Sequence, residues 1–281
     1  MLHIHLLTAA MALRARMPPL MSAEGGAAAV WSSIQSQASN AASTSSVLEE
    51  YFAKTVTRHS TLPDALASAL AGKLASNDVP RDLLEQELAA LLAEPDVCAA
   101  VVRDLDAVVE ADPAAPDLLT VMLHFKGFSA IAAHRAAHTL WARGPDDAGS
   151  RHLALLLQGR ASEIFGVDIH PGARIGAGVF IDHATGIVIG EQAAVGDDCY
   201  ILHGVTLGAT GKRDKTGRRH PLVGSGCTIG SGASVLGPIT VGDGATVGAN
   251  AVVTKNVEAG ATVIDTAFMN NRVLAPKKPK V

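Results

Sequence analysis

Aromatic side chains are scarce in this sequence: only 4% of its 281 residues are Phe, Trp or Tyr, although 48% are hydrophobic. A core with so few rings has to be built from small aliphatic side chains. The sequence contains no run of about 18 apolar residues, so we expect no membrane-spanning helix. The length is sufficient for one large domain or two modest ones.

Basic residues and cysteines are also few. Lys and Arg total 23 against 27 Asp and Glu, a formal net charge of −4, so the chain lacks the basic footprint that nucleic-acid binding usually leaves. Cys98, Cys199 and Cys227 are odd in number and form no Cys-x-x-Cys pair, which argues against a disulfide framework and a structural zinc site. The sequence favours a small-molecule ligand and a reducing compartment.

The N-terminal segment 1–29 carries little information on structure. No acidic residue precedes Glu24, and Arg14 and Arg16 follow the short apolar run at 6–13. A secretory signal places its positive charge before the apolar stretch, so that interpretation is disfavoured. We predict a disordered tail over 1–29 and a cytoplasmic protein, or a plastid or mitochondrial one if this segment is a transit peptide.

Glycine usage divides the chain near residue 166, because 20 of the 27 glycines lie between Gly166 and Gly260. Before that point leucines recur at helical spacing, which predicts an all-helical domain over 30–165. Its expected helices lie near 47–58, 63–76, 81–93, 96–110, 117–142 and 150–164. The predicted fold class is therefore α+β with the two kinds of structure in separate domains.

After residue 166 the hydrophobic period becomes six. The aliphatic positions are Ile169, Ile175, Ile181 and Ile187, then Ile189, Val195, Ile201 and Leu207, then Val223, Ile229, Val235, Val241, Val247 and Val253. Neither a strand nor a helix has this period, whereas a three-sided solenoid with one short strand per hexad does. We predict a parallel β-helix over 166–262 and a C-terminal tail over 263–281. The repeat is interrupted by one extruded loop, 208–222, which is a candidate functional element.

Four histidines, His170, His183, His203 and His220, lie on or beside the predicted solenoid. They are spaced too widely along the chain for a zinc site in such a solenoid, and we expect no metal. Asp168 and His183 are separated by slightly less than three hexads, which places them on adjacent coils near one corner. A carboxylate beside one ring nitrogen would leave the other free to take a proton, so His183 is a candidate general base. The alternative is that Asp168 caps a strand and His183 is an ordinary surface residue.

Several motifs resemble those of the serine acetyltransferases over roughly residues 30–260. They are Val167-Asp168-Ile169-His170-Pro171, Ile181-Asp182-His183-Ala184-Thr185-Gly186, Leu202-His203-Gly204-Val205-Thr206-Leu207-Gly208, Arg219-His220-Pro221 and Phe125-Lys126-Gly127-Phe128. The resemblance implies a left-handed parallel β-helix and the transfer of an acetyl group from acetyl-CoA to the hydroxyl of L-serine. This reaction gives O-acetyl-L-serine, the first step of cysteine synthesis from serine.

The resemblance also assigns roles to individual residues. It implies that His183 is the general base and that Asp168 orients it. Asp112 and Asp182 match the carboxylates that hold the serine amino group, although Asp112 is also a natural turn-former before a proline. Arg219 and His220 match the loop residues that meet the serine carboxylate. Contacts to coenzyme A are expected, largely through backbone groups, around Gly208, Thr210, Gly211, Ser231 and Ala249.

Assembly and regulation are implied in the same way. We expect a homotrimer or a dimer of trimers, active sites between neighbouring prisms, and feedback inhibition by cysteine. The sequence departs from the family at Ala209, where a glycine is usual, and over 268–272. It ends in Val281 on a basic tail rather than in Ile, so we expect the partnership with O-acetylserine sulfhydrylase to be weak or absent. Two other functions stay open, an acetyltransferase for a different hydroxyl acceptor and a non-catalytic homologue that serves in assembly.

Overall fold

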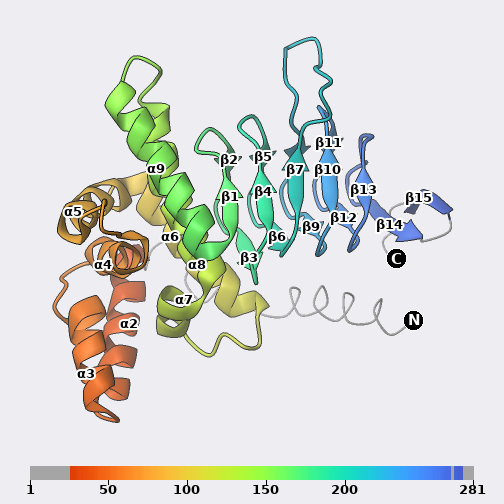
Figure 1. The fold of residues 1–281 in the computed structure, drawn as a ribbon. Coiled ribbons are helices and arrows are strands. Elements are labelled where there is room, and N and C mark those ends of the chain that lie inside the picture. Colours follow the sequence, from red (N-terminus) through yellow and green to blue (C-terminus); the bar gives the residue numbers. More distant parts are fainter. Residues whose placement is uncertain (1–25, 267–268, 275–281) are drawn as a thin grey trace.

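The computed structural model of the chain describes residues 26–266 and 269–274, which form two halves (Figure 1). A cluster of helices comes first, and a stack of short strands extends away from it. The predicted order of a helical domain followed by a solenoid is confirmed. In the described part of the chain, no helix is long and apolar enough to cross a membrane.

The helical half has, within those residues, eight α-helices and one π-helical segment. These are α2 (Gly26–Ala42), α3 (Ser46–Phe52), η1 (Ala53–Thr57), α4 (Leu62–Leu74), α5 (Arg81–Leu92), α6 (Pro95–Ala111), α7 (Leu118–His124), α8 (Lys126–Ala142) and α9 (Ala148–Phe165). Local signals account for their ends. The hydroxyl of Thr61 accepts from the N–H of Asp64 at the start of α4, and Gly166 ends α9 in the left-handed region at φ 67°.

Two helical boundaries differ from those expected. α2 already includes residues 26–29, which the sequence assigned to a disordered tail. The helix expected over 117–142 is divided at Phe125, which adopts an extended conformation at φ −84° and ψ 108°. The division lets the first turn of α8 approach strand β3 (Phe180–Asp182) very closely, because a Cβ at Gly127 would overlap the carbonyl oxygen of Ile181.

The solenoid half is a three-sided prism. Its strands are β1 (Val167–Ile169), β2 (Arg174–Ile175), β3, β4 (Ile187–Ile189), β5 (Ala194–Val195), β6 (Tyr200–Leu202), β7 (Thr206–Gly208), β8 (Leu222–Val223), β9 (Thr228–Ile229), β10 (Ser234–Leu236), β11 (Thr240–Val241), β12 (Thr246–Val247), β13 (Val252–Val253), β14 (Thr262–Thr266) and β15 (Met269–Leu274). Each strand pairs in parallel with the third one after it, in the orders β1-β4-β7-β10-β13, β2-β5-β8-β11 and β3-β6-β9-β12, and β14 continues the last of these sheets beside β12. Together with the solved structures to which the chain is similar, this defines a left-handed parallel β-helix.

The register shows how regular the coils are. Ile189 pairs with Leu207 and Val235 with Val253, and each of these steps is the length of three hexads. Asp168 pairs with Val188, which is a slightly longer step, and the additional residues lie in the turn before β4. Leu207 pairs with Val235 in a much longer step, because the extruded loop lies between them. The loop itself runs over 209–221, since Gly208 and Leu222 belong to strands.

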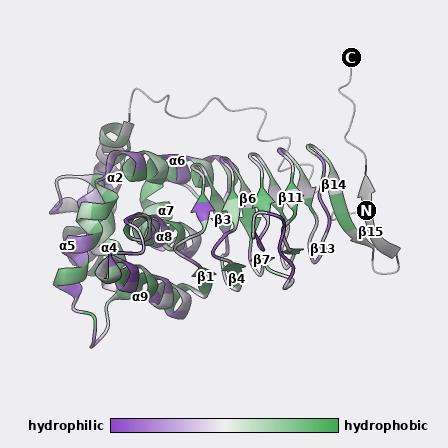
Figure 2. Cartoon of the chain, turned by 90° about the horizontal axis from the view of Figure 1, so that it is seen from above, coloured by the Kyte–Doolittle hydropathy of each residue, from purple (hydrophilic) through white to green (hydrophobic). Residues whose placement is uncertain are grey.

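Aliphatic side chains fill the prism, and the hydropathy colouring shows its strands mostly as hydrophobic (Figure 2). Among the described residues of the solenoid, the Phe and Tyr side chains are Phe180 and Tyr200, whose rings stack on adjacent coils with centroids 4.9 Å apart. The narrow interior accounts for the small number of aromatic residues. At the far end, β14 pairs in parallel with β12 and antiparallel with β15, so part of the expected tail 263–281 is strand. Val281 lies outside the described residues.

A buried ion pair joins the two halves. Arg135 of α8 donates from Nε and Nη2 to the carboxylate of Asp104 in α6 at 2.7 and 2.8 Å. The same guanidinium donates to the carbonyl of Gly176, and the carboxylate accepts from the N–H of Val179. Because both partners also bind solenoid backbone, this pair fixes the first coil against the helices.

Candidate active site at two corners of the prism

The first candidate region is the row of turns between sheets β3-β6-β9-β12 and β4-β7-β10-β13, here called the His183 corner. Its first turn, 183–186, carries the additional residues of the first coil. His183 and Ala184 both have positive φ, 55° and 60°, which is uncommon for residues other than glycine. The turn is closed by short backbone hydrogen bonds, such as Ala184 N–H to the Asp182 carbonyl at 2.6 Å. It leaves the His183 side chain 76% exposed.

A carboxylate lies beside this histidine. Nε2 of His183 is 3.6 Å from Oδ1 of Asp182, and Oδ2 of Asp182 accepts a hydrogen bond of 2.7 Å from the hydroxyl of Tyr200. Burial raises the pKa of Tyr200, and the negative charges of Asp182 and Asp112 raise it further. Asp112 ends α6 and accepts from the N–H of Ala114. The structure therefore places Asp182 beside His183, and Asp112 close enough to Tyr200 for its charge to raise the pKa of that phenol.

The same corner continues along the prism. The rings of His183 and His203 make an edge contact with centroids 5.8 Å apart. His203, Ser231 and Ala249 occupy equivalent positions on successive coils, because Gly232 N–H donates to the His203 carbonyl and Asn250 N–H to the Ser231 carbonyl. Two of the residues expected to contact coenzyme A thus lie in line with the candidate base.

Asp168 lies on the outer surface of β1, between the buried residues Val167 and Ile169. Its Oδ1 accepts a hydrogen bond of 2.6 Å from Nε2 of Gln158 in α9. Within the described residues it makes no hydrogen bond to His183. The expected contact of Asp168 with the candidate base is therefore absent from the isolated chain, although β1 pairs directly with β4, the strand that follows the His183 turn.

Arg219 and His220 lie elsewhere, at the row of turns 170–173, 190–193 and 209–221, here called the loop corner. Nη2 of Arg219 is 3.5 Å from Oε2 of Glu191, and its N–H donates to the side chain of Gln192. The ring of His220 packs so closely over Gly190 that a Cβ there would overlap it. Burial lowers the pKa of His220, and the charge of Arg219 lowers it further.

The start of the extruded loop belongs to this corner. Gly208 ends β7, Thr210 packs against Gly237 of the next coil, and Gly211 adopts a positive φ of 79°. Ala209 is not among the described residues with positive φ, so the methyl group that replaces the usual glycine causes no backbone strain. Arg218 donates to the carboxylate of Asp214 at 3.0 Å and to the carbonyls of Pro238 and Ile239, so its guanidinium stabilises the loop and holds it against the next coil.

One side of the prism separates the two corners. The His183 turn directly precedes the short strand β4, and Gly190 directly follows it.

Among the described residues no cluster of three or more His, Cys, Asp or Glu side chains could hold a metal ion. The sequence analysis missed Tyr200 and Gln158. Tyr200 carried a signal, as one of only two aromatic residues in the solenoid, but Gln158 carried none within a helical leucine run.

A left-handed prism of hexapeptide repeats with an exposed histidine on a strained turn defines a hexapeptide-repeat acyltransferase. A family model described as "Serine acetyltransferase, N-terminal" matches residues 30–133, and one described as "Bacterial transferase hexapeptide (six repeats)" matches 220–255. The chain is 50% identical over 212 residues to probable serine acetyltransferase 4 of Oryza sativa subsp. japonica. That match covers 75% of this chain but just under two thirds, 65%, of the rice protein.

Two further relatives agree. Over 236 residues the chain is 48% identical to serine acetyltransferase 1, chloroplastic, of Arabidopsis thaliana, covering 84% of this chain and 73% of that protein. The crystal structure of serine acetyltransferase in complex with coenzyme A from Brucella abortus strain S19 superposes with a TM-score of 0.82 at 39% identity, covering 89% of this chain and 96% of that one. The chain belongs to the serine acetyltransferase family.

Proposed function

We propose that this chain is a serine O-acetyltransferase, which transfers the acetyl group of acetyl-CoA to the hydroxyl of L-serine. The observation that carries the proposal is the His183 corner, where an exposed imidazole lies 3.6 Å from the carboxylate of Asp182. A base next to an anionic side chain suits a nucleophile whose hydroxyl must lose a proton while its ammonium group is held. Family membership supplies the acetyl donor.

His183 is the general base in this mechanism. A ring nitrogen takes the proton of the serine hydroxyl as that oxygen attacks the thioester carbon. The C–S bond then breaks, and the imidazolium returns its proton to the leaving thiolate, which gives CoA–SH and the ester. No acyl-enzyme forms, so holding both substrates together and moving one proton accounts for the rate.

Asp168 is proposed to orient His183 once the catalytic assembly is complete. The pairing of β1 with β4, the strand that follows the His183 turn, supports this role because it keeps Asp168 on the coil adjacent to that turn. A carboxylate that accepts from one ring nitrogen selects the tautomer and stabilises the imidazolium that forms during transfer.

Serine carries both charges, so its recognition requires anionic and cationic groups together. Asp112 and Asp182 supply the anionic end at the His183 corner, and Arg219 and His220 supply the cationic end at the loop corner. Because one side of the prism separates these corners, a complete site needs the loop corner of a neighbouring copy. We therefore propose a trimer, or a dimer of trimers, with each site between two prisms.

The same geometry suits coenzyme A. Ser231 and Ala249 extend in a row from His203 along one prism, and Gly208, Thr210 and Gly211 line the loop corner that the neighbouring copy would bring to them. Small residues let an extended pantetheine arm approach the backbone. Inhibition by cysteine at the serine site and weak binding of O-acetylserine sulfhydrylase stay predictions.

The test is an assay of thiol release from acetyl-CoA with L-serine, with other hydroxyl acceptors, and with water alone. For His183→Ala we expect serine-dependent release to fall by about 10²–10⁴-fold, the usual contribution of a positioned base. The exposed His152 of α9 offers a matched control, and His152→Ala should keep wild-type activity. The wild-type kcat/KM should also fall at acidic pH, because a protonated ring cannot act as a base.

Each alternative function predicts a different result in the same assay. Release that depends on another acceptor but not on serine would identify an acetyltransferase of different specificity. No release with any acceptor would identify a non-catalytic homologue. Unchanged serine-dependent release by His183→Ala would overturn the mechanism even if the activity is present.

A further inference from the structure

Gln158 makes a contact that the proposed mechanism does not use. It lies two turns before the end of α9, and its Nε2 donates to Oδ1 of Asp168 at 2.6 Å. An ionised carboxylate can only accept hydrogen bonds, so the amide must present its NH₂ group to Asp168. One oxygen of the carboxylate is thereby committed to Gln158, and the other stays available.

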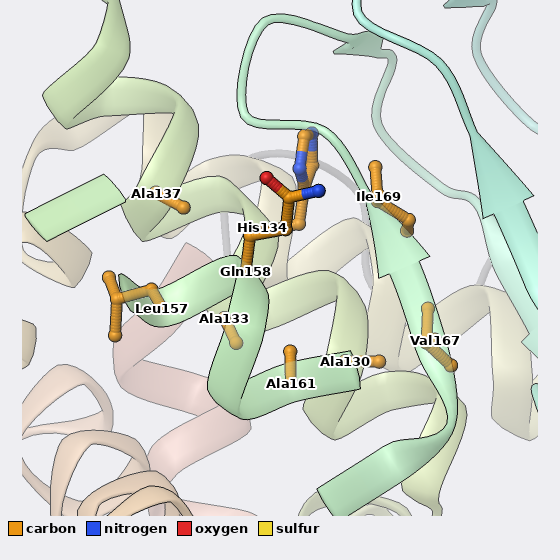
Figure 3. A pocket seen from close by; sticks show the side chains of 9 residues that line it. All are labelled: Ala130, Ala133, His134, Ala137, Leu157, Gln158, Ala161, Val167 and Ile169. Carbon is orange, nitrogen blue, oxygen red and sulfur yellow. The ribbon is translucent and has the colours of Figure 1, made fainter. Parts of the chain in front are cut away.

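The surroundings restrict this amide. Gln158 lines a cavity of about 10 Å³ between α8, α9 and β1, together with His134 and apolar residues that include Val167 and Ile169, the two neighbours of Asp168 (Figure 3). The amide and the imidazole of His134 are the polar side chains in the lining, and the other groups are aliphatic. Apolar walls offer the amide few other partners, and a hydrogen bond is stronger in such a low-dielectric setting.

Among the described residues, no buried cation competes for the carboxylate. Burial lowers the pKa of His134 to about 3, with smaller contributions from His138 and Arg135, so its ring is neutral at working pH. The guanidinium of Arg135 is already engaged by Asp104. Asp168 acts on the titratable ring of His170, just after β1: burial lowers the pKa of His170, the negative charges of Glu191 and Asp168 oppose that shift, and the positive charges of Arg151 and Arg219 add to it.

We propose that Gln158 is a positioning residue for acetyl transfer: its amide holds one oxygen of Asp168 and turns the other toward the His183 turn. This inference rests on the proposed function. Gln158 touches no reacting atom, so its effect should be on the rate of transfer and not on substrate binding. The helix α9 that carries it runs directly into β1, which fixes the amide and the carboxylate on one continuous rigid segment.

The first test replaces the amide by an apolar side chain of similar size. For Gln158→Leu we expect kcat to fall about tenfold with both KM values unchanged, because only part of the ~10²–10⁴-fold contribution of a general base depends on its orientation. Gln37 provides a matched control, since it is also half-buried and its Oε1 accepts from the N–H of Leu119. Gln37→Leu should lower the melting temperature and leave kcat unchanged.

The second test gives a signature that a packing role cannot produce. In Gln158→Glu a protonated carboxyl can donate to Asp168 as the amide does, whereas an ionised one repels it. The kcat of this variant relative to wild type should therefore fall as pH rises from about 5 to 8, with the decline centred above the usual glutamate pKa because the two carboxylates share a site.

The outcomes separate this inference from the function on which it depends. If His183→Ala is inactive while Gln158→Leu keeps wild-type kcat and Gln158→Glu follows the wild-type pH profile, the role of Gln158 is wrong and the function stands. If His183→Ala keeps wild-type serine-dependent release, the general-base mechanism on which this inference depends fails, and if the wild type shows no such release, the proposed function itself fails. Should Gln158→Leu not fold, the pH profile of the isosteric Gln158→Glu still decides.

Discussion

The helical half buries an ion pair and several titratable groups, whereas the prism buries mostly aliphatic side chains, with two thiols and the imidazole of His220. Asp104, Arg135 and His134 are each at most 8% exposed, and burial lowers the pKa of the Lys73 ammonium to about 8. In the solenoid the tightest constraints are instead steric, where the backbone of one coil meets that of the next. Electrostatics should therefore dominate the response of the helical half to mutation, and close packing should dominate that of the solenoid.

We expect the largest loss of stability at Arg135, because its charge is buried and its guanidinium also packs against the solenoid backbone. Arg135→Met leaves the Asp104 carboxylate buried without its cation, which costs about 3–5 kcal/mol in other proteins. We expect a loss of that size in the free energy of unfolding measured with urea. The double variant Asp104→Leu/Arg135→Met should recover much of it because no charge then stays buried. A loss below about 1 kcal/mol for the single variant would show that this ion pair behaves like a surface one.

Gly→Ala substitutions should have a smaller effect on the free energy of unfolding. The sign of this effect should differ between the two halves. A Cβ at Gly230 would lie 2.5 Å from the amide nitrogen of Ala249 on the next coil, so Gly230→Ala should destabilise by about 1–3 kcal/mol. At Gly159, inside α9, a Cβ meets nothing within 4 Å. Gly159→Ala should therefore stabilise by about 0.5–1 kcal/mol through helix propensity. Thermal unfolding of both variants gives the signs, and equal signs would contradict the comparison.

The smallest effect concerns mild acid. The folded pKa of His134 is lowered from 6.5 to about 3, so the unfolded chain binds the additional proton between these values. Stability contributed by the neutral ring is complete above pH 6.5 and is lost as pH falls through this window. Over the first pH unit below 6.5 the loss is about 1 kcal/mol.

Urea unfolding across that interval measures the loss directly. In His134→Leu the acid slope should decrease, whereas His59→Leu, which removes a surface histidine bonded to the Lys54 carbonyl, should keep it. An unchanged slope in His134→Leu would show that another group causes the acid sensitivity.

The solenoid could be predicted closely from the sequence. The position of a residue in the hexad repeat determines the side of the prism and the coil on which it lies, and whether its side chain points into the prism. The register from Ile169 to Val253 follows the aliphatic positions throughout. Helix ends were less predictable, since the break at Phe125 depends on how closely Gly127 must approach β3. The pairing of β14 with β15 was also missed, because those residues lie beyond the last regular hexad.

The candidate site residues could be named from their motifs, but their arrangement could not be predicted. Asp182 and His183 are adjacent in sequence, so their proximity was certain, whereas Asp112 comes near Tyr200 only through the packing of α6. The separation of Arg219 and His220 from His183 follows from the corner that each occupies, which sequence spacing does not specify. Gln158 could not be found, because a polar residue on one helix face has the same pattern whether it meets solvent or a carboxylate.

The extruded loop of 209–221 has a consequence for how such a molecule can vary. Strand pairing on its two sides is the same as in uninterrupted coils, with Ala194 opposite Leu222 and Leu222 opposite Thr240. The prism therefore imposes no length on this segment, and insertions or deletions there leave every other coil in place. The length of this loop can therefore change without altering the β-helix. Such changes would alter how far the loop extends and which ligand groups it contacts.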